Sequence, residues 1–251
     1  MMENKRKLKK RWLILSAALI VLVVVIFCRV WILQGIGQFL VADDDDFRSS
    51  HYAVLGGNSA ERGHAAAWIA SIQPSAKFIT TGGNRPSQLA AIGIHTYDAI
   101  LTQKKMEQCG VESDKIDAIT AGTSSKEEAE ILLQHCQKHG ISDITIVSGQ
   151  YHLRRLRQTF EPLFEAAGIQ IKFFGAIEKD FDPNHWWQSE SGLIYTNNAM
   201  CKIDSICIGK GKDYYISCAN FFCWYLRGKN HIPCLNRRFH TSRRHCLKRC
   251  L

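Results

Sequence analysis

Two stretches decide the fold of this chain: HYAVLGGN at residues 51–58 and ITIVSGQYHLRR at residues 144–155. Each is an apolar run that predicts a buried strand, followed by a glycine turn and by polar or charged residues that open a helix. In a parallel α/β sheet, ligands bind at the carboxyl ends of the strands, where helix N-termini favour anions. The His and two Arg of the second stretch therefore predict a pocket for a negatively charged ligand.

Strand and helix patterns alternate along the rest of the domain, which we place at residues 51–199. We expect strands at 52–55, 77–81, 116–120, 144–147 and 169–174, and helices at 60–72, 88–109, 126–139 and 153–167. Short apolar strands separated by helices of ten or more residues predict an α/β fold, in which a parallel sheet carries helices on both faces.

The N-terminus predicts a membrane anchor. Residues 1–11 carry six Lys or Arg, and residues 12–33 are almost uncharged. At ~1.5 Å per residue this run spans ~33 Å, enough for a bilayer of ~30 Å. The alternative is a cleaved signal peptide, but no small-x-small site follows the run, which favours an uncleaved transmembrane helix. The basic flank stays in the cytoplasm, so the domain is expected outside the bacterial inner (plasma) membrane.

Charge is unevenly distributed along the chain. Residues 41–50 contain four consecutive Asp, at 43–46, and predict a solvated acidic linker. Residues 41–199 contain 14 basic and 20 acidic residues, and this balance argues against nucleic-acid binding by the domain.

Three glycine-containing turns supply candidate ligand-binding residues. The first holds Gly56, Gly57 and Asn58, with Glu61 and Arg62 in the next helical turn, and the second holds Gly82 and Gly83. Glycine lets backbone N–H groups approach a ligand, although turns also use it for purely steric reasons. After the third strand come Thr123, Ser124, Ser125, Glu127 and Glu128. These residues predict a capping box, and their hydroxyls also suit a phosphate.

The turn after the fourth strand carries Gln150, His152, Arg154 and Arg155. An imidazole can act as acid, base or orienting group, so His152 is the candidate catalytic residue. Arg154 and Arg155 are candidate anion clamps, because arginines at a helix start oppose the helix dipole unless an anion lies nearby. No metal site is predicted, and the cofactor is left unknown.

Cysteines concentrate in the last fifty residues. Residues 200–251 hold seven of the ten Cys and eleven Lys or Arg, without hydrophobic periodicity. A disulfide-rich module, a zinc site and an out-of-frame translation are the three explanations, and the third is favoured. The remaining helical cysteines, Cys109 and Cys136, are expected in the core or in one disulfide.

These motifs together resemble the ElyC/SanA/YdcF family, also called domain of unknown function 218. The matching segments cover about residues 50–198 and include VLGG at 54–57, TTGG at 80–83, TSSKEEA at 123–129 and VSGQYHLRR at 147–155. The pattern departs from the family at Glu127-Glu128, where the family commonly has an Asn after its Thr, and at SGQYH (148–152), where the family commonly has Ser-Ala-Tyr-His. The resemblance implies a Rossmann-like fold behind one transmembrane helix, and a link to envelope polysaccharide or peptidoglycan metabolism. It also implies a final apolar helix after Asn198.

The expected function is that of a membrane-anchored domain binding a small anionic ligand or an envelope lipid intermediate. Whether it is an enzyme stays open. A non-enzymatic envelope-integrity or scaffold factor is the main alternative, and a soluble cytoplasmic nucleotide-binding enzyme is a weaker one.

Overall fold

The computed structural model describes residues 2–208, with side chains described for residues 10–203. The helices are α1 (Met2–Leu40), α2 (Ser59–Ile72), α3 (Ser87–Ala90), α4 (Asp98–Gln108), α5 (Ser125–His139), α6 (Leu153–Ala166) and α7 (Glu190–Ile208). The strands are β1 (His51–Val54), β2 (Lys77–Thr81), β3 (Ile116–Ile119), β4 (Asp143–Gly149) and β5 (Gln170–Ala176). Short 3₁₀ turns are η1 (Ser113–Lys115), η2 (Gln150–His152) and η3 (Trp186–Gln188).

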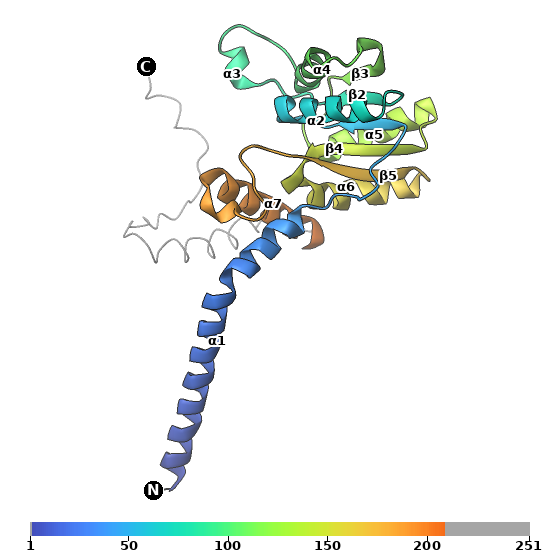
Figure 1. Ribbon diagram of the computed structural model, residues 1–251. Helices are drawn as coiled ribbons and strands as arrows, with labels where there is room; N and C mark the ends of the chain where they lie inside the picture. The colour runs from blue at the N-terminus through green and yellow to red at the C-terminus, as the bar shows by residue number, and fades with distance from the viewer. Residues whose placement is uncertain (1, 209–251) are drawn as a thin grey trace, which may run out of the picture. The chain divides into compact units, whose positions relative to one another are not determined.

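The five strands form one parallel sheet in the order β3-β2-β1-β4-β5. This confirms the predicted Rossmann-like α/β class (Figure 1). The strand order reverses between β1 and β4, which pair in register from His51 with Ile144 to Val54 with Val147. A reversal of this kind opens a crevice at the carboxyl ends of the two strands. β1 and β4, the strands of the two stretches quoted first, therefore end side by side. We call this side of the sheet, where the strands have their carboxyl ends, the carboxyl edge.

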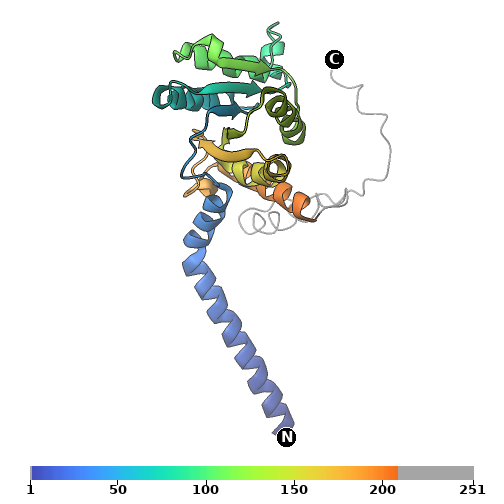
Figure 2. The ribbon, with the colours of Figure 1, turned by 90° about the vertical axis from the view of Figure 1, so that its right-hand side faces the viewer.

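Alternating residues of the central strands supply two separate cores. On one face Ala53 and Leu55 pack with α5 and α6, whose buried residues include Leu132 and Phe160. On the other face Tyr52 and Val54 pack with α2 and α4. Figure 2 shows the sheet between these two helix layers. The period of two in each strand thus covers both faces, as expected of a parallel sheet.

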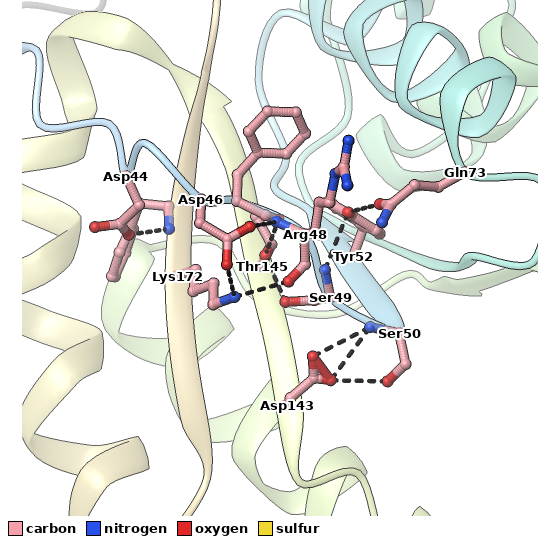
Figure 3. A network of polar contacts seen from close by, with 12 residues as sticks. Asp44, Asp46, Arg48, Ser49, Ser50, Tyr52, Gln73, Asp143, Thr145 and Lys172 are labelled. Atoms are coloured by element: carbon pink, nitrogen blue, oxygen red, sulfur yellow. Dashed lines mark hydrogen bonds and ion pairs between the residues drawn. The ribbon is translucent and has the colours of Figure 1, made fainter.

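The acidic segment is mostly exposed, as predicted, but it is not a free linker, because two of its carboxylates bond to β5. Asp43 accepts a hydrogen bond from the Gly175 N–H, and Asp44 accepts one from the Phe173 N–H, so the segment runs against the direction of β5. Further on, Lys172 Nζ donates to Asp46 at 3.1 Å (Figure 3). Carboxylates can accept the free N–H groups of an edge strand, and here the Asp run covers that edge.

Helix α1 is longer than the predicted span and its last turns pack on the domain. Residues 10–40 are long and apolar enough to cross a membrane, with a mean hydropathy of 3.0 in the most apolar window and none of that window buried. Beyond that window the Trp186 indole N–H donates to the Leu33 carbonyl at 2.7 Å. Leu40 is fully buried against Ala199 and Ile203 of α7. The last turns of α1 are therefore part of the folded domain.

Three further predictions need correction. Residues 88–109 do not form one helix, because the chain turns between α3 and α4 at Gly93, whose φ is +81°. The predicted tail boundary at residue 200 falls inside α7, which continues to Ile208. Residues 209–251, with the remaining tail cysteines, lie outside the described residues. Cys109 and Cys136 are both free, and only Cys136 is buried, so neither the disulfide nor a core position for Cys109 is found.

Candidate functional site

The carboxyl edge is built on glycines that let two loops touch backbone to backbone. A Cβ added at Gly56 would lie 2.8 Å from the Cα of Gly82, and Gly82 itself has a φ of +129°. At Gly83 the N–H donates to the Gly122 carbonyl at 2.7 Å, which joins the next pair of loops. The sequence left two roles open for these glycines, a ligand cradle or a purely steric role in the turns. The close contacts between the loops show that the steric role is present.

Glu128 holds these loops together from α5. Its carboxylate Oε1 accepts hydrogen bonds from the Gly56 N–H at 2.9 Å and from the Thr81 hydroxyl at 2.8 Å. The residue is 7% exposed. Burial raises the pKa of this carboxyl, and the two hydrogen bonds oppose the rise. Glu128 is thus a fixed buried carboxylate inside the predicted ligand-binding region.

Arg62 is the second organising residue, and it is 4% exposed. Its Nη1 donates to the carbonyls of Leu55 and Gly56, where β1 ends. Its Nη2 lies 3.9 Å from Glu178 Oε1, and both side chains are almost fully buried. The Nε of Arg62 is buried without a described partner. The two Nη groups of Arg62 are therefore directed to partners within the protein.

Glu178 is a site residue that the sequence reasoning missed. It follows β5 by two residues, is 5% exposed, and its Oε2 is buried with no partner among the described residues. Burial raises the pKa of Glu178 to about 7, the nearby Arg62 opposes the rise, and Glu61 and Asp180 add to it. The signal was present in the sequence, because a polar residue just after a strand is what identified the other turns.

Cationic side chains surround His152, which lies in η2 between β4 and α6. The Nδ1 of His152 lies 3.3 Å from the Arg155 Nη2. Burial lowers the pKa of His152 well below 6.5, and the charges of Arg62, Arg155 and Lys202 lower it further. The ring is therefore neutral at pH 7, and Nδ1 can accept a hydrogen bond from Arg155. The Nε of Arg155 is buried and has no described partner.

Arg154, the neighbour of Arg155, is placed elsewhere. Its Nε donates to the Phe39 carbonyl at 2.9 Å, and its guanidinium lies 4.5 Å from the centre of the Phe39 ring. This arrangement satisfies a carbonyl at the end of α1. The structure therefore does not bring Arg154 together with the other predicted clamp.

The remaining predicted residues are largely engaged in capping. Asn58 is the N-cap of α2 and also donates to Glu61 Oε2 at 2.6 Å, while Glu61 Oε1 accepts from the Lys179 N–H. Ser124 is the N-cap of α5, as predicted. The other predicted residues lie nearby: Gly57 against the Arg62 guanidinium, Thr123 bonded to Glu127, Ser125 at the start of α5, and Gln150 beside Gly175.

Together the carboxyl-edge site comprises six ionisable residues from five parts of the chain: Arg62, Asp98, Glu128, His152, Arg155 and Glu178. Asp98 is buried at the start of α4, and burial raises its pKa. No group of three or more His, Cys, Asp or Glu that could hold a metal occurs among the described residues. A cavity of about 150 Å³ lies at the opposite edge of the sheet, beside Pro74 and Val111.

Comparison with protein-family models and with curated proteins finds no match to this chain.

Proposed function

We propose that the domain binds an anionic, phosphorylated or nucleotide-like ligand at the carboxyl-edge site. The observation that carries this proposal is the Arg155 guanidinium, whose Nη2 lies 3.3 Å from the Nδ1 of a neutral His152 and whose buried Nε has no described partner. The positive charges of Arg62 and Lys202 act on the same His152 ring, and cations gathered in a partly buried site repel one another. A bound anion relieves this repulsion, and guanidinium groups are well suited to phosphate and carboxylate.

The accessible part of the site supports the same conclusion. Both guanidinium groups keep a buried Nε without a described partner, but Arg62 is almost fully buried with its Nη groups directed to the β1 carbonyls and Glu178, whereas Arg155 is only half-buried. We therefore assign anion binding mainly to Arg155. His152 then serves as the hydrogen-bonding or acid–base group beside the bound ligand.

The matched pair Arg154 and Arg155 provides the test. We would screen the full chain in detergent micelles for thermal stabilisation by sugar phosphates, nucleotide sugars, polyprenyl phosphates and adenosyl cofactors. Loss of a hydrogen bond to a charged group costs ~1.5–3 kcal/mol, so Arg155→Ala should weaken binding by about 10- to 100-fold. Arg154→Ala should leave affinity almost unchanged. Equal losses in the two variants, or no stabilisation by any anion, would count against the proposal.

We also propose that α1 anchors the domain in the bacterial inner membrane, with the N-terminus in the cytoplasm and residues 41–199 outside. The basic residues before the apolar run support this orientation. The resemblance to the ElyC/SanA/YdcF family supports a place in envelope polysaccharide or peptidoglycan metabolism. Protease protection in intact spheroplasts checks the topology: digestion of the domain from outside is expected, and full protection would contradict it.

A non-enzymatic scaffold is the alternative, and the docking of α1 on the domain favours it. The Trp186–Leu33 hydrogen bond and the buried Leu40 tie the anchor to the folded domain. Replacing residues 12–30 by an unrelated apolar sequence, while keeping residues 31–40, should abolish the envelope phenotype of a scaffold that recruits a partner through its anchor. The same exchange should spare a ligand-binding enzyme, whereas His152→Ala should disable it.

A further inference from the structure

We propose that Glu178 is the proton-exchanging group of the carboxyl-edge site, so that an anion binds there together with a proton. This inference rests on the proposed anion-binding function. It begins from the position of the carboxyl group, which lies between α2 and the turn that carries His152. Arg62 Nη2 is 3.9 Å from Oε1. A Cβ at Gly149 would meet both oxygens of the same carboxyl group, Oε1 as well as Oε2, the latter at 2.5 Å.

Gly149 leaves the space that this carboxyl occupies. It ends β4 and is the N-cap residue of η2, so any side chain there would displace the carboxyl from the turn. Despite this close packing, Oε2 has no hydrogen-bond partner among the described residues. A buried carboxylate oxygen without a partner is costly, and a proton on that oxygen lowers the cost.

The charges around the site make the proton necessary. Three buried carboxyl groups, those of Asp98, Glu128 and Glu178, lie near two guanidinium groups, those of Arg62 and Arg155. If all three carboxyls were ionised, they would balance the cations Arg62, Arg155 and Lys202, and no net positive charge would remain for an incoming anion. Protonation of one carboxyl leaves a net positive charge for the ligand.

Glu178 is the carboxyl best placed to take up the proton. Glu128 accepts two hydrogen bonds that favour its ionised form, and Glu178 has none to Oε2. Burial raises the pKa of Glu178 to about 7, so both protonation states are populated at neutral pH. The ionisable groups that face it are Arg62 and Glu61 on α2, Asp180 in the same loop, Tyr151 in η2 and Tyr195 in α7.

Linkage gives the expected size of the effect. If only the protonated form of Glu178 binds the anion, affinity falls about tenfold between pH 6 and pH 8 for a group that titrates near 7. At pH 7 about half a proton is then taken up for each anion bound. The lowered pKa of His152 keeps its own protonation out of this range unless the anion raises it.

Isothermal titration of the full chain in detergent with sulfate provides the test, because sulfate does not titrate between pH 6 and pH 8. The number of protons comes from the binding heat in two buffers of different ionisation enthalpy. We expect the wild type to show the tenfold fall and the half proton. We expect Glu178→Gln to bind sulfate with no pH dependence, and Glu161→Gln, which loses a carboxyl paired with Arg157, to behave as wild type.

The possible outcomes separate this inference from the proposed function. Sulfate binding without proton uptake by the wild type, or uptake that survives in a folded Glu178→Gln variant, would overturn the role of Glu178 and leave anion binding intact. If neither sulfate nor any phosphorylated ligand binds, the proposed function fails and this inference fails with it. An absence of proton uptake by the wild type overturns the role of Glu178 even if the variant does not fold.

Discussion

The two ends of the parallel sheet differ in how their polar side chains are buried and paired. At the amino end, the polar side chains are exposed or paired: Asp143 accepts from Ser50, and Lys172 donates to both Asp46 and the Arg48 carbonyl (Figure 3). At the carboxyl end, charged side chains are buried and several atoms have no described partner, among them Glu178 Oε2 and Arg155 Nε. Fully paired polar groups stabilise a fold, whereas unpaired buried ones persist where a ligand can complete them.

Removing one cation at each end should give the largest difference in stability between a carboxyl-end variant and an amino-end variant. Arg62→Met takes away a buried charge that faces Glu178 and two backbone carbonyls, and should cost about 3–5 kcal/mol of unfolding free energy. Lys172→Met breaks a pair with the exposed Asp46 and should cost about 1 kcal/mol or less. Denaturant unfolding of both variants in detergent measures the difference, and similar losses would show that the two ends are energetically alike.

The pH dependence of stability sharpens the comparison at Glu178. Its pKa is about 7 in the folded protein and 4.5 in the reference state, so the folded state binds more protons between these values. Stability is then fully present below pH 4.5 and is lost as pH rises through 7, by about 3 kcal/mol in all. Buried His152 acts in the opposite direction, because its lowered pKa makes the folded state lose stability below pH 6.5.

The difference in unfolding free energy between wild type and Glu178→Gln isolates the contribution of Glu178 to the pH dependence, because both proteins keep His152. The unfolding free energies of the two should diverge as pH rises from 5 to 8. The amino-end variant Lys172→Met serves as the control and should keep a constant offset from wild type over the same range. A constant offset between wild type and Glu178→Gln would show that Glu178 does not titrate there.

A smaller effect is expected from the glycine contact at the carboxyl end. Gly56→Ala places a methyl group 2.8 Å from the Gly82 backbone, which cannot rotate away, so about 1–3 kcal/mol should be lost. At Gly140, which caps α5 with a φ of +63°, the space is open. Gly140→Ala should therefore cost only the backbone strain of about 1 kcal/mol. Thermal unfolding compares the two, and a larger loss at Gly140 would contradict the close approach of the two loops.

The smallest expected effect belongs to Asp143 at the amino end. Asp143→Asn keeps the size of the side chain and one of its acceptors for the Ser50 N–H and hydroxyl. We expect a loss of about 0.5–1 kcal/mol and no change in anion affinity. A measurable loss of anion binding in this variant would show that the amino end also contributes to anion binding.

Apolar periodicity predicted the fold well because burial on both faces of a parallel sheet leaves a direct pattern in the sequence. The strand at 77–81 has the same bounds as β2, and the glycine at 140 ends α5 as expected. The predicted helix at 88–109 was wrong because the pattern does not show where the chain turns at Gly93. The bonding of the acidic segment to β5 was not predicted, because its partners are backbone N–H groups, which leave no trace in side-chain composition.

The sequence by itself determined the fold class, the apolar N-terminal helix and the turns that carry charged residues, because these depend on local patterns of burial and glycine. Only the tertiary structure decided which of those residues meet. Arg154 and Arg155 are adjacent in the chain, yet helical geometry directs one to Phe39 and the other to His152. Glu178 reaches the site because of the strand order. β5 lies beside β4, so the loop that follows β5 packs against Gly149 and Arg62. Long-range packing sets these distances, and it is not encoded in any short stretch of sequence.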